Sequence, residues 1–206
     1  MANYCSNSIV FYSKERLKLA RFLRKVYAAF DSKGSGFWNL LVLHGYTNRQ
    51  IAGLADKRDC FTCCDTRLTQ DNDTYSFKVD TETAWEPHMA VFYKIIREKY
   101  DNVIQFVYMA EECGSQLYIN SDETGRYFSE HYVIDCCHHG EFFKEYFSSY
   151  REAVDWIRDE YCVGISEHDS LKTVELKVEA VSDLDNGDFF NFHRFESGYG
   201  EERGAA

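Results

Sequence analysis

The pattern of apolar and polar side chains in the first 30 residues predicts a strand followed by a helix. Residues 5–12, CSNSIVFY, are rich in β-branched and aromatic side chains, which favour a β-strand. After Ser13, a suitable helix-capping residue, apolar side chains recur every three or four positions, as on one face of an α-helix. The apolar positions are Leu19, Phe22, Leu23, Val26 and Phe30, and the opposite face carries Lys14, Lys18, Arg21, Arg24 and Lys25.

The next elements predict a β-hairpin. Residues from 34 to about 57 show no clean period, so we expect a loop there with a short helix near residues 48–54. Segments 57–66 and 73–81 predict two strands, because apolar and polar side chains alternate along the second segment. The sequence TQDND between them is typical of a turn.

The single proline, Pro87, marks the start of a second predicted helix, where its missing N–H group leaves no hydrogen bond unmade. A strand at residues 102–109 follows this helix. We expect Trp85 to fill the corner between sheet and helix, and its alternative role is that of an exposed binding anchor. The apolar stripe of the helix consists of Met89, Phe92, Tyr93, Ile96 and Tyr100.

The order of strand, helix, two strands, helix and strand is typical of the split βαβ, or ferredoxin-like, fold. In that fold, both helices cover one face of an antiparallel sheet. Segments 115–119 and 126–134 then predict an added hairpin around the turn NSDETG. The class is therefore α+β.

The C-terminal region predicts one further helix and one strand. Residues 150–161 repeat with helical spacing, whereas 172–180, KTVELKVEA, alternate apolar and charged side chains as a strand with one wet face does. We therefore expect a ferredoxin-like domain over residues 1–135 and an acidic helix-strand extension over residues 136–206, packed on the same body.

Composition indicates a globular protein of the cytoplasm. The chain has 206 residues, of which 17% are aromatic, too large an apolar content for a disordered acidic chain. It contains no run of about 20 apolar residues and no secretory signal at its start. In a reducing compartment the eight cysteines are expected as thiols, not as a disulfide framework.

The net charge of −11 is unevenly distributed. Residues 1–110 carry 15 Lys and Arg against 12 Asp and Glu, whereas residues 111–206 carry 8 against 22. An acidic surface attracts basic partners and repels phosphates, although such charge also simply keeps a protein soluble.

Three short motifs resemble the YubB ferredoxin-like domain family, small proteins encoded by plasmids and phages. They are ANYCSN at residues 2–7, ETAW at residues 82–85 with Pro87 after it, and YMAEECGSQLYI at residues 108–119. Tyr4 and Ser115 depart from the family pattern. The resemblance covers about residues 2–135 and implies a ferredoxin-like fold and a mobile-element origin, without catalytic residues.

Cysteine and histidine clusters raise the alternative of a zinc or thiol protein. Cys60 and Cys63 could join Cys136 and Cys137, beside His138 and His139, in a tetrahedral site. Cys60 and Cys63, however, would point to opposite faces of the predicted strand. We therefore favour buried thiols and expect no metal, no cofactor and no catalytic residues.

The leading functional hypothesis is a non-enzymatic protein of phage or plasmid origin that binds a basic host protein inside the bacterial cell. Its acidic surface would imitate nucleic-acid phosphates and inhibit a host defence system, as an anti-CRISPR does. The alternative is a nucleic-acid-binding module that uses the basic first helix. The predicted contact residues are Asp183, Asp185, Asp188, Phe189, Phe190, Glu196, Glu201 and Glu202.

Overall fold

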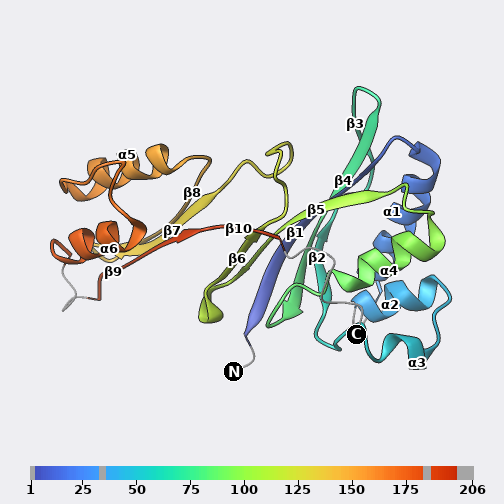
Figure 1. The fold of residues 1–206 in the computed structure, drawn as a ribbon. Helices are drawn as coiled ribbons and strands as arrows, with labels where there is room; N and C mark the ends of the chain where they lie inside the picture. The colour runs from blue at the N-terminus through green and yellow to red at the C-terminus, as the bar shows by residue number, and fades with distance from the viewer. Residues whose placement is uncertain (1–2, 33–35, 183–186, 199–206) are drawn as a thin grey trace. The chain divides into compact units, whose positions relative to one another are not determined.

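The computed structural model describes residues 3–32, 36–182 and 187–198. The chain divides into two compact units (Figure 1). We call residues 1–121 with 198–206 unit 1, and residues 122–197 unit 2. Helices and antiparallel strands occur in both units, which confirms the α+β class.

Unit 1 consists of an antiparallel sheet and the helices that cover it. In chain order its elements are β1 (Tyr4–Ser13), α1 (Arg16–Phe30), α2 (Gly36–Leu43), α3 (Asn48–Ile51), β2 (Cys60–Cys64), β3 (Thr69–Asp71), β4 (Thr74–Ala84), α4 (Ala90–Lys99), β5 (Gln105–Glu112), the 3₁₀ helix η1 (Cys113–Ser115) and β6 (Leu117–Asn120). The strands run in the order β6-β5-β1-β4-β2, with β3 beside β4. Helices α1, α2 and α4 lie on one face of the sheet (Figure 1).

The core of unit 1 centres on Phe11 of β1. Its ring lies 4.9 Å from that of Phe22 in α1, 5.2 Å from that of Phe77 in β4 and 5.1 Å from that of Phe92 in α4, between ring centroids. All four rings are almost completely buried. Their contacts join α1 and α4 to the strands β1 and β4. Aromatic pairs of this kind bury a large apolar area and also favour specific ring geometries.

Most predicted elements of unit 1 are confirmed. The strand at 5–12, the two long helices, the short helix near residue 48 and the strands predicted in segments 57–66, 73–81 and 102–109 occur as expected. Residues 36–43, expected as a loop, form α2 instead. Phe37, Leu40 and Leu41 are fully buried, so a short helix enclosed by the core needs no regular polar face and shows no clean period.

Unit 2 is a three-stranded antiparallel sheet with the order β8-β7-β9, packed against two helices. Its elements are β7 (Tyr132–His138), β8 (Glu141–Phe147), α5 (Tyr150–Tyr161), α6 (Leu171–Glu179), β9 (Phe189–Arg194) and the two-residue strand β10 (Glu196–Ser197). Fully buried Ile134, Val154, Ile157 and Val174 form the centre of its core. The expected domain boundary at residue 135 falls within β7, whereas the division between the units follows Ser121.

The predicted pairing of segments 115–119 and 126–134 is wrong. β6 pairs with β5, and β7 pairs with β8 and β9. The reason lies in the residues between them, which form a loop around buried Asp122. Its carboxylate accepts hydrogen bonds from the backbone N–H groups of Thr124, Tyr127 and Phe128. Burial opposes the charged carboxylate, yet these hydrogen bonds lower the pKa of Asp122.

The strand predicted at residues 172–180 is also wrong, because these residues form α6. The side chain of Ser170 caps this helix by accepting a hydrogen bond from the N–H of Thr173. Val174 and Val178 are fully buried at helical spacing, whereas Leu176 is 58% exposed. In the predicted strand, Leu176 would share a face with Val174 and Val178. In the helix, Leu176 points away from the face of the two valines.

Candidate functional site

Half of the predicted contact residues, Asp183, Asp185, Glu201 and Glu202, lie outside the described residues. The other four belong to β9 and its neighbours. Asp188 and Phe190 are buried, at 6% and 5% exposure, Phe189 is partly exposed, and Glu196 is exposed. Successive side chains of a strand point to opposite faces, so Phe189 and Phe190 cannot both face a partner. Phe190 packs in the core of unit 2 and is not a surface contact residue.

The outer face of the unit 2 sheet carries aromatic side chains that the sequence analysis did not single out. Phe142 in β8 is 77% exposed, and its ring centroid lies 6.0 Å from that of Phe189. Tyr146 lies four residues further along β8, on the same face of the strand as Phe142. It is 39% exposed and stacks on Phe195. Register pairs Phe142 with Cys137, which itself pairs with Phe189 on β9. The alternation of residues 142, 144 and 146 could have revealed this face.

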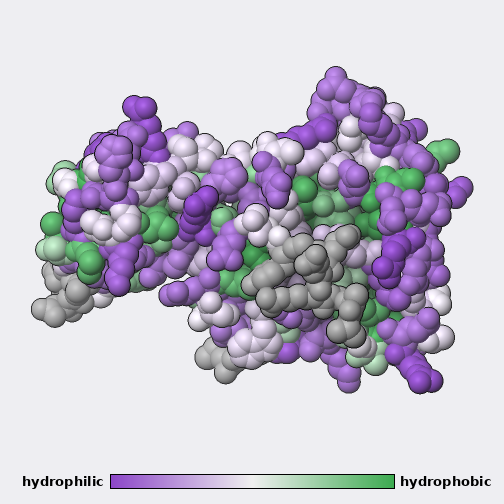
Figure 2. All heavy atoms as spheres, in the orientation of Figure 1, coloured by the Kyte–Doolittle hydropathy of each residue, from purple (hydrophilic) through white to green (hydrophobic). Residues whose placement is uncertain are grey.

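The net negative charge belongs to unit 2 alone. Residues 122–197 carry 18 Asp and Glu against 7 Lys and Arg, a net charge of −11. Unit 1 carries 16 of each sign and is neutral overall. Figure 2 shows hydrophilic residues over much of the visible side of α5 and α6, with smaller hydrophobic patches between them. The acidic half predicted from the sequence is thus one folded unit with a sheet of its own.

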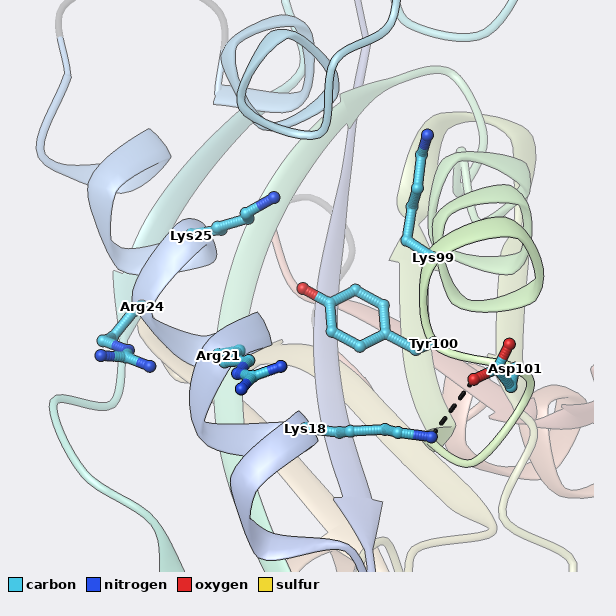
Figure 3. A pocket seen from close by; sticks show the side chains of 7 residues that line it. All are labelled: Lys18, Arg21, Arg24, Lys25, Lys99, Tyr100 and Asp101. Atoms are coloured by element: carbon cyan, nitrogen blue, oxygen red, sulfur yellow. Dashed lines mark hydrogen bonds and ion pairs between the residues drawn. The ribbon is translucent and has the colours of Figure 1, made fainter.

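A basic groove lies between α1 and α4 of unit 1, with a volume of about 620 Å³ (Figure 3). Five cationic side chains line it, with Tyr100 and Asp101 at the end of α4. Asp101 accepts a hydrogen bond from Lys18, 3.2 Å away. The cations are Lys18, Arg21, Arg24, Lys25 and Lys99.

Positive charge in this groove exceeds what its one carboxylate neutralises. Burial, and then the nearby charge of Lys99, lower the pKa of Lys25. His44, behind the groove, has its pKa lowered to about 4, first by burial and also by these two lysines. Neutral His44 donates from Nδ1 to the Leu40 carbonyl, so its Nε2 accepts the Tyr100 hydroxyl hydrogen over 3.1 Å. Such a site favours an anionic ligand.

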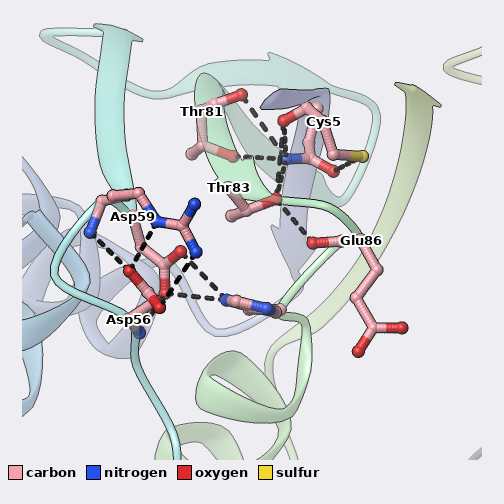
Figure 4. A network of polar contacts seen from close by, with 9 residues as sticks. Cys5, Asp56, Asp59, Thr81, Thr83 and Glu86 are labelled. Atoms are coloured by element: carbon pink, nitrogen blue, oxygen red, sulfur yellow. Dashed lines mark hydrogen bonds and ion pairs between the residues drawn. The ribbon is translucent and has the colours of Figure 1, made fainter. Parts of the chain in front are cut away.

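The motifs that resemble the YubB family meet in a buried polar network (Figure 4). Asn7, 3% exposed, donates from Nδ2 to Thr83 Oγ1 over 3.0 Å and to Thr81 Oγ1 over 3.2 Å. The Cys5 thiol donates to Asn7 Oδ1, and Thr83 donates to the Glu86 carbonyl over 2.7 Å. Register explains the meeting, since Asn7 stands opposite Thr81 in the β1–β4 pair.

The third motif reaches the same end of the sheet. The buried Glu112 carboxylate accepts hydrogen bonds from the N–H groups of Gly114 and Ser115 over 3.0 and 2.6 Å. Burial opposes its charge, but these hydrogen bonds lower the pKa of Glu112. Gly114 lies against the Asn3 side chain so closely that a Cβ atom there would collide with it. The carbonyl of Asn3 also accepts the N–H of Trp85.

The expectation that Trp85 fills the corner between sheet and helix is wrong. Its side chain is 50% exposed, and its backbone has a φ of 71°, in the left-handed region that few residues other than glycine adopt. Pro87 also precedes the helix instead of lying in its first turn, because α4 begins at Ala90. The alternative role of Trp85 as an exposed binding anchor stays a hypothesis.

All eight cysteines are free thiols. Burial raises the pKa of Cys5 and of Cys64 to about 12, so neither forms a nucleophilic thiolate at neutral pH. Cys60 is partly buried and Cys63 exposed, with a bulge in β2 between them. Cys136 and Cys137 are both buried, on opposite faces of β7. Cys136 and Cys137 therefore do not present their thiols side by side. The bulge instead places Cys60 and Cys63 opposite Glu82 and Asp80 of β4, so both lie on one face of the sheet and the prediction of opposite faces is wrong.

No family model matches the chain, and the comparison with curated proteins finds no match. Among solved structures, the chain is similar to a protein assigned as a glycine cleavage system transcriptional repressor. The identity is 8%, the TM-score is 0.26, and the match covers 93% of this chain and 98% of the other. A likeness this distant carries no argument. Within the described residues, no helix has the length and apolar character needed to cross a membrane.

Proposed function

We propose that the chain is a non-enzymatic binding protein whose acidic unit 2 docks a basic partner protein. The observation that carries this proposal is the segregation of charge, because unit 2 holds the whole net charge of −11 and unit 1 is neutral. Complementary charge speeds association and selects partners more than it adds affinity. Affinity therefore needs an apolar anchor in the same unit.

Phe142 supplies that anchor on the outer face of the unit 2 sheet. It is 77% exposed and lies beside Phe189 and near Tyr146 on the same face. Exposed aromatic side chains on a rigid sheet are typical of interface hot spots, since they lose little conformational freedom on binding. Glu141 and Glu145 on the same strand are also exposed, although they point to the other face of the sheet.

We further propose that unit 1 is a ferredoxin-like domain of the YubB type. The strand order β5-β1-β4-β2, with helices on one face, supports this fold. The contact of Asn7 with Thr83 and that of Asn3 with Glu112 support the resemblance, because they join its first motif to each of the other two. A mobile-element protein of this kind would act in the cytoplasm of a bacterial host. Its partner would be a nucleic-acid-binding component of a defence system, which an acidic surface can inhibit.

Affinity capture from a bacterial lysate tests the docking surface when variants are compared. Wild-type protein, Phe142→Ala and Leu17→Ala are immobilised in equal amounts; Leu17 is the control because it is 73% exposed but belongs to unit 1. We expect the wild type to capture a partner protein. Retention of this partner should fall about tenfold or more with Phe142→Ala, as loss of a hot spot would cause, and should not change with Leu17→Ala. Its retention should also fall as salt rises. If the amount of captured protein is the same for Phe142→Ala and the wild type, or does not change with salt concentration, the proposal is contradicted.

A second candidate function is nucleic-acid binding by the basic groove of unit 1. The groove favours it because Arg21, Arg24 and Lys25 form no ion pair within the described residues, which leaves their charge available to phosphates. Filter binding of a single-stranded oligonucleotide at two salt concentrations tests this function. Arg21→Ala should weaken binding and reduce the salt slope by about one unit. Lys172→Ala, an exposed change in unit 2, is the control, and equal binding by both variants would exclude the groove.

A further inference from the structure

The β7–β8 hairpin of unit 2 brings two histidines to its tip. β7 ends at His138 and β8 begins at Glu141, which pairs with His138, so His139 and Gly140 form a two-residue turn. Both turn residues have positive φ, 52° and 80°, as a type I′ turn requires. The tight turn directs the exposed His139 side chain beside His138, and the two ring centroids lie 3.9 Å apart.

The register of β7 with β9 places a carboxylate at the same position. Cys137 pairs with Phe189 in this antiparallel pair, so the residue before Phe189, Asp188, comes opposite His138. Asp188 Oδ2 lies 3.4 Å from His138 Nδ1. The side chains of His138 and Asp188 are 12% and 2% exposed, so their polar atoms have little access to water.

Two observations show that this group is not an ordinary hydrogen-bonded pair. His138 Nδ1 is buried and forms no hydrogen bond within the described part of the chain. Ligand atoms from His138, His139 and Asp188 all lie within 4.8 Å of one another. In a tetrahedral zinc site, bonds of about 2.0–2.1 Å separate neighbouring ligand atoms by about 3.3 Å, close to the His138–Asp188 distance.

We propose that His138, His139 and Asp188 form a site for a transition-metal dication, with Zn²⁺ as the ion to test. Two imidazoles and one carboxylate match the ligand preferences of zinc and leave the fourth position to water. His139 is exposed, so its side chain can move the remaining distance without disturbing the core. The ring of Tyr161, 4.3 Å from that of His138 between centroids, supports the inner imidazole.

The cysteines next to this site are not part of the ligand set. Cys137 points to the opposite face of β7, and Cys136 is completely buried in the core. The site therefore differs from a zinc centre built on the Cys60, Cys63, Cys136 and Cys137 cluster. It would tie the hairpin tip to the start of β9.

Titration of the full-length, untagged protein with ZnCl₂, followed by calorimetry, tests the site. The wild type should bind one Zn²⁺ per chain, and zinc should raise its unfolding temperature because the ion binds only the folded site. His139→Ala should weaken binding at least about tenfold, since even outer-shell partners of metal ligands contribute that much. Because His139 is exposed, this variant should fold normally without zinc. His168→Ala, another exposed histidine of unit 2, should bind zinc as the wild type does.

Cobalt substitution identifies the ligand atoms independently of affinity. We expect the visible absorption of four-coordinate Co²⁺ without the thiolate-to-cobalt band that a cysteine ligand produces, and we expect both Asp188→Asn and His139→Ala to abolish it. A thiolate band would overturn the proposal in favour of a cysteine site. Unchanged zinc affinity in His139→Ala, or the absence of zinc binding by the wild type, would also overturn it.

Discussion

The Asn7 side-chain amide donates a hydrogen bond to the Thr83 hydroxyl over 3.0 Å, between residues 76 positions apart in the chain. β1 and β4 are neighbours in the sheet, and their register brings the two residues together. Both belong to motifs that suggested the YubB resemblance. The motifs therefore share a structural function, since the amide also binds the Cys5 carbonyl and the Thr81 hydroxyl.

Replacing Asn7 with alanine should destabilise unit 1 by about 2 kcal/mol, because buried polar partners then lose their hydrogen bonds. Chemical denaturation followed by circular dichroism measures the change. Gln70→Ala is the control, since Gln70 is exposed and donates only to the nearby Asn72 carbonyl. A loss of stability no larger than that of the control would show that the network contributes little.

Alanine at Gly114 should destabilise unit 1 by about 1 kcal/mol, the lower end of the usual range for overpacking, because the colliding atoms are the ends of side chains. Its Cβ atom would collide with the Asn3 side chain and lie 2.9 Å from Glu112 Oε1. Gly53→Ala is the matched control, because a Cβ atom there has no neighbour within 4 Å. Thermal unfolding of the two variants compares them directly, and equal unfolding temperatures would contradict the close packing of the third motif.

The His88–Asp59 pair should make the stability of unit 1 depend on pH. The hydrogen bond that His88 Nδ1 donates to the fully buried Asp59 carboxylate, over 2.8 Å, raises the pKa of His88 above its ordinary value of 6.5. A raised folded-state pKa means that the protonated histidine stabilises the fold. This contribution is complete below the unfolded pKa and is lost as the pH rises through the folded one.

Denaturation at about pH 5.5 and about pH 8.5 measures this contribution, since these values lie on either side of the ordinary histidine pKa. The free energy of unfolding should fall more between them for the wild type than for His88→Gln, whose amide can still donate to Asp59 but does not titrate. His168→Gln, at an exposed histidine, should behave as the wild type does. Identical pH dependence in wild type and His88→Gln would be inconsistent with a stabilising ion pair.

Adjacent phenylalanines of β9 should respond differently to truncation. Phe190→Ala removes a ring that is 5% exposed and should destabilise unit 2 by about 3–5 kcal/mol, the usual cost of emptying a core position. Phe189→Ala removes a partly exposed ring and should cost less than about 1 kcal/mol. Near-ultraviolet circular dichroism during thermal unfolding distinguishes them. A larger effect at Phe189 would mean that β9 faces the opposite way.

Local sequence patterns were enough to predict those elements that pack one face on a core. The apolar positions Leu19, Phe22 and Val26 predicted α1, and alternation predicted β4, because a regular local pattern appears wherever one side of an element packs on a core. Counting charged residues likewise located the negative charge in the second half of the chain. None of these predictions required knowledge of a distant partner.

The pairing of the elements and the contacts between distant side chains became visible in the folded chain alone. Residues 172–180 satisfy both an alternating and a helical pattern, and the Ser170 cap with the buried Val174 and Val178 selects the helix. The register of β7 with β9 buries Asp188 next to His138, 50 residues away in the chain and therefore outside any local pattern. Partner choice depends on contacts between distant segments, and local periodicity carries no record of those contacts.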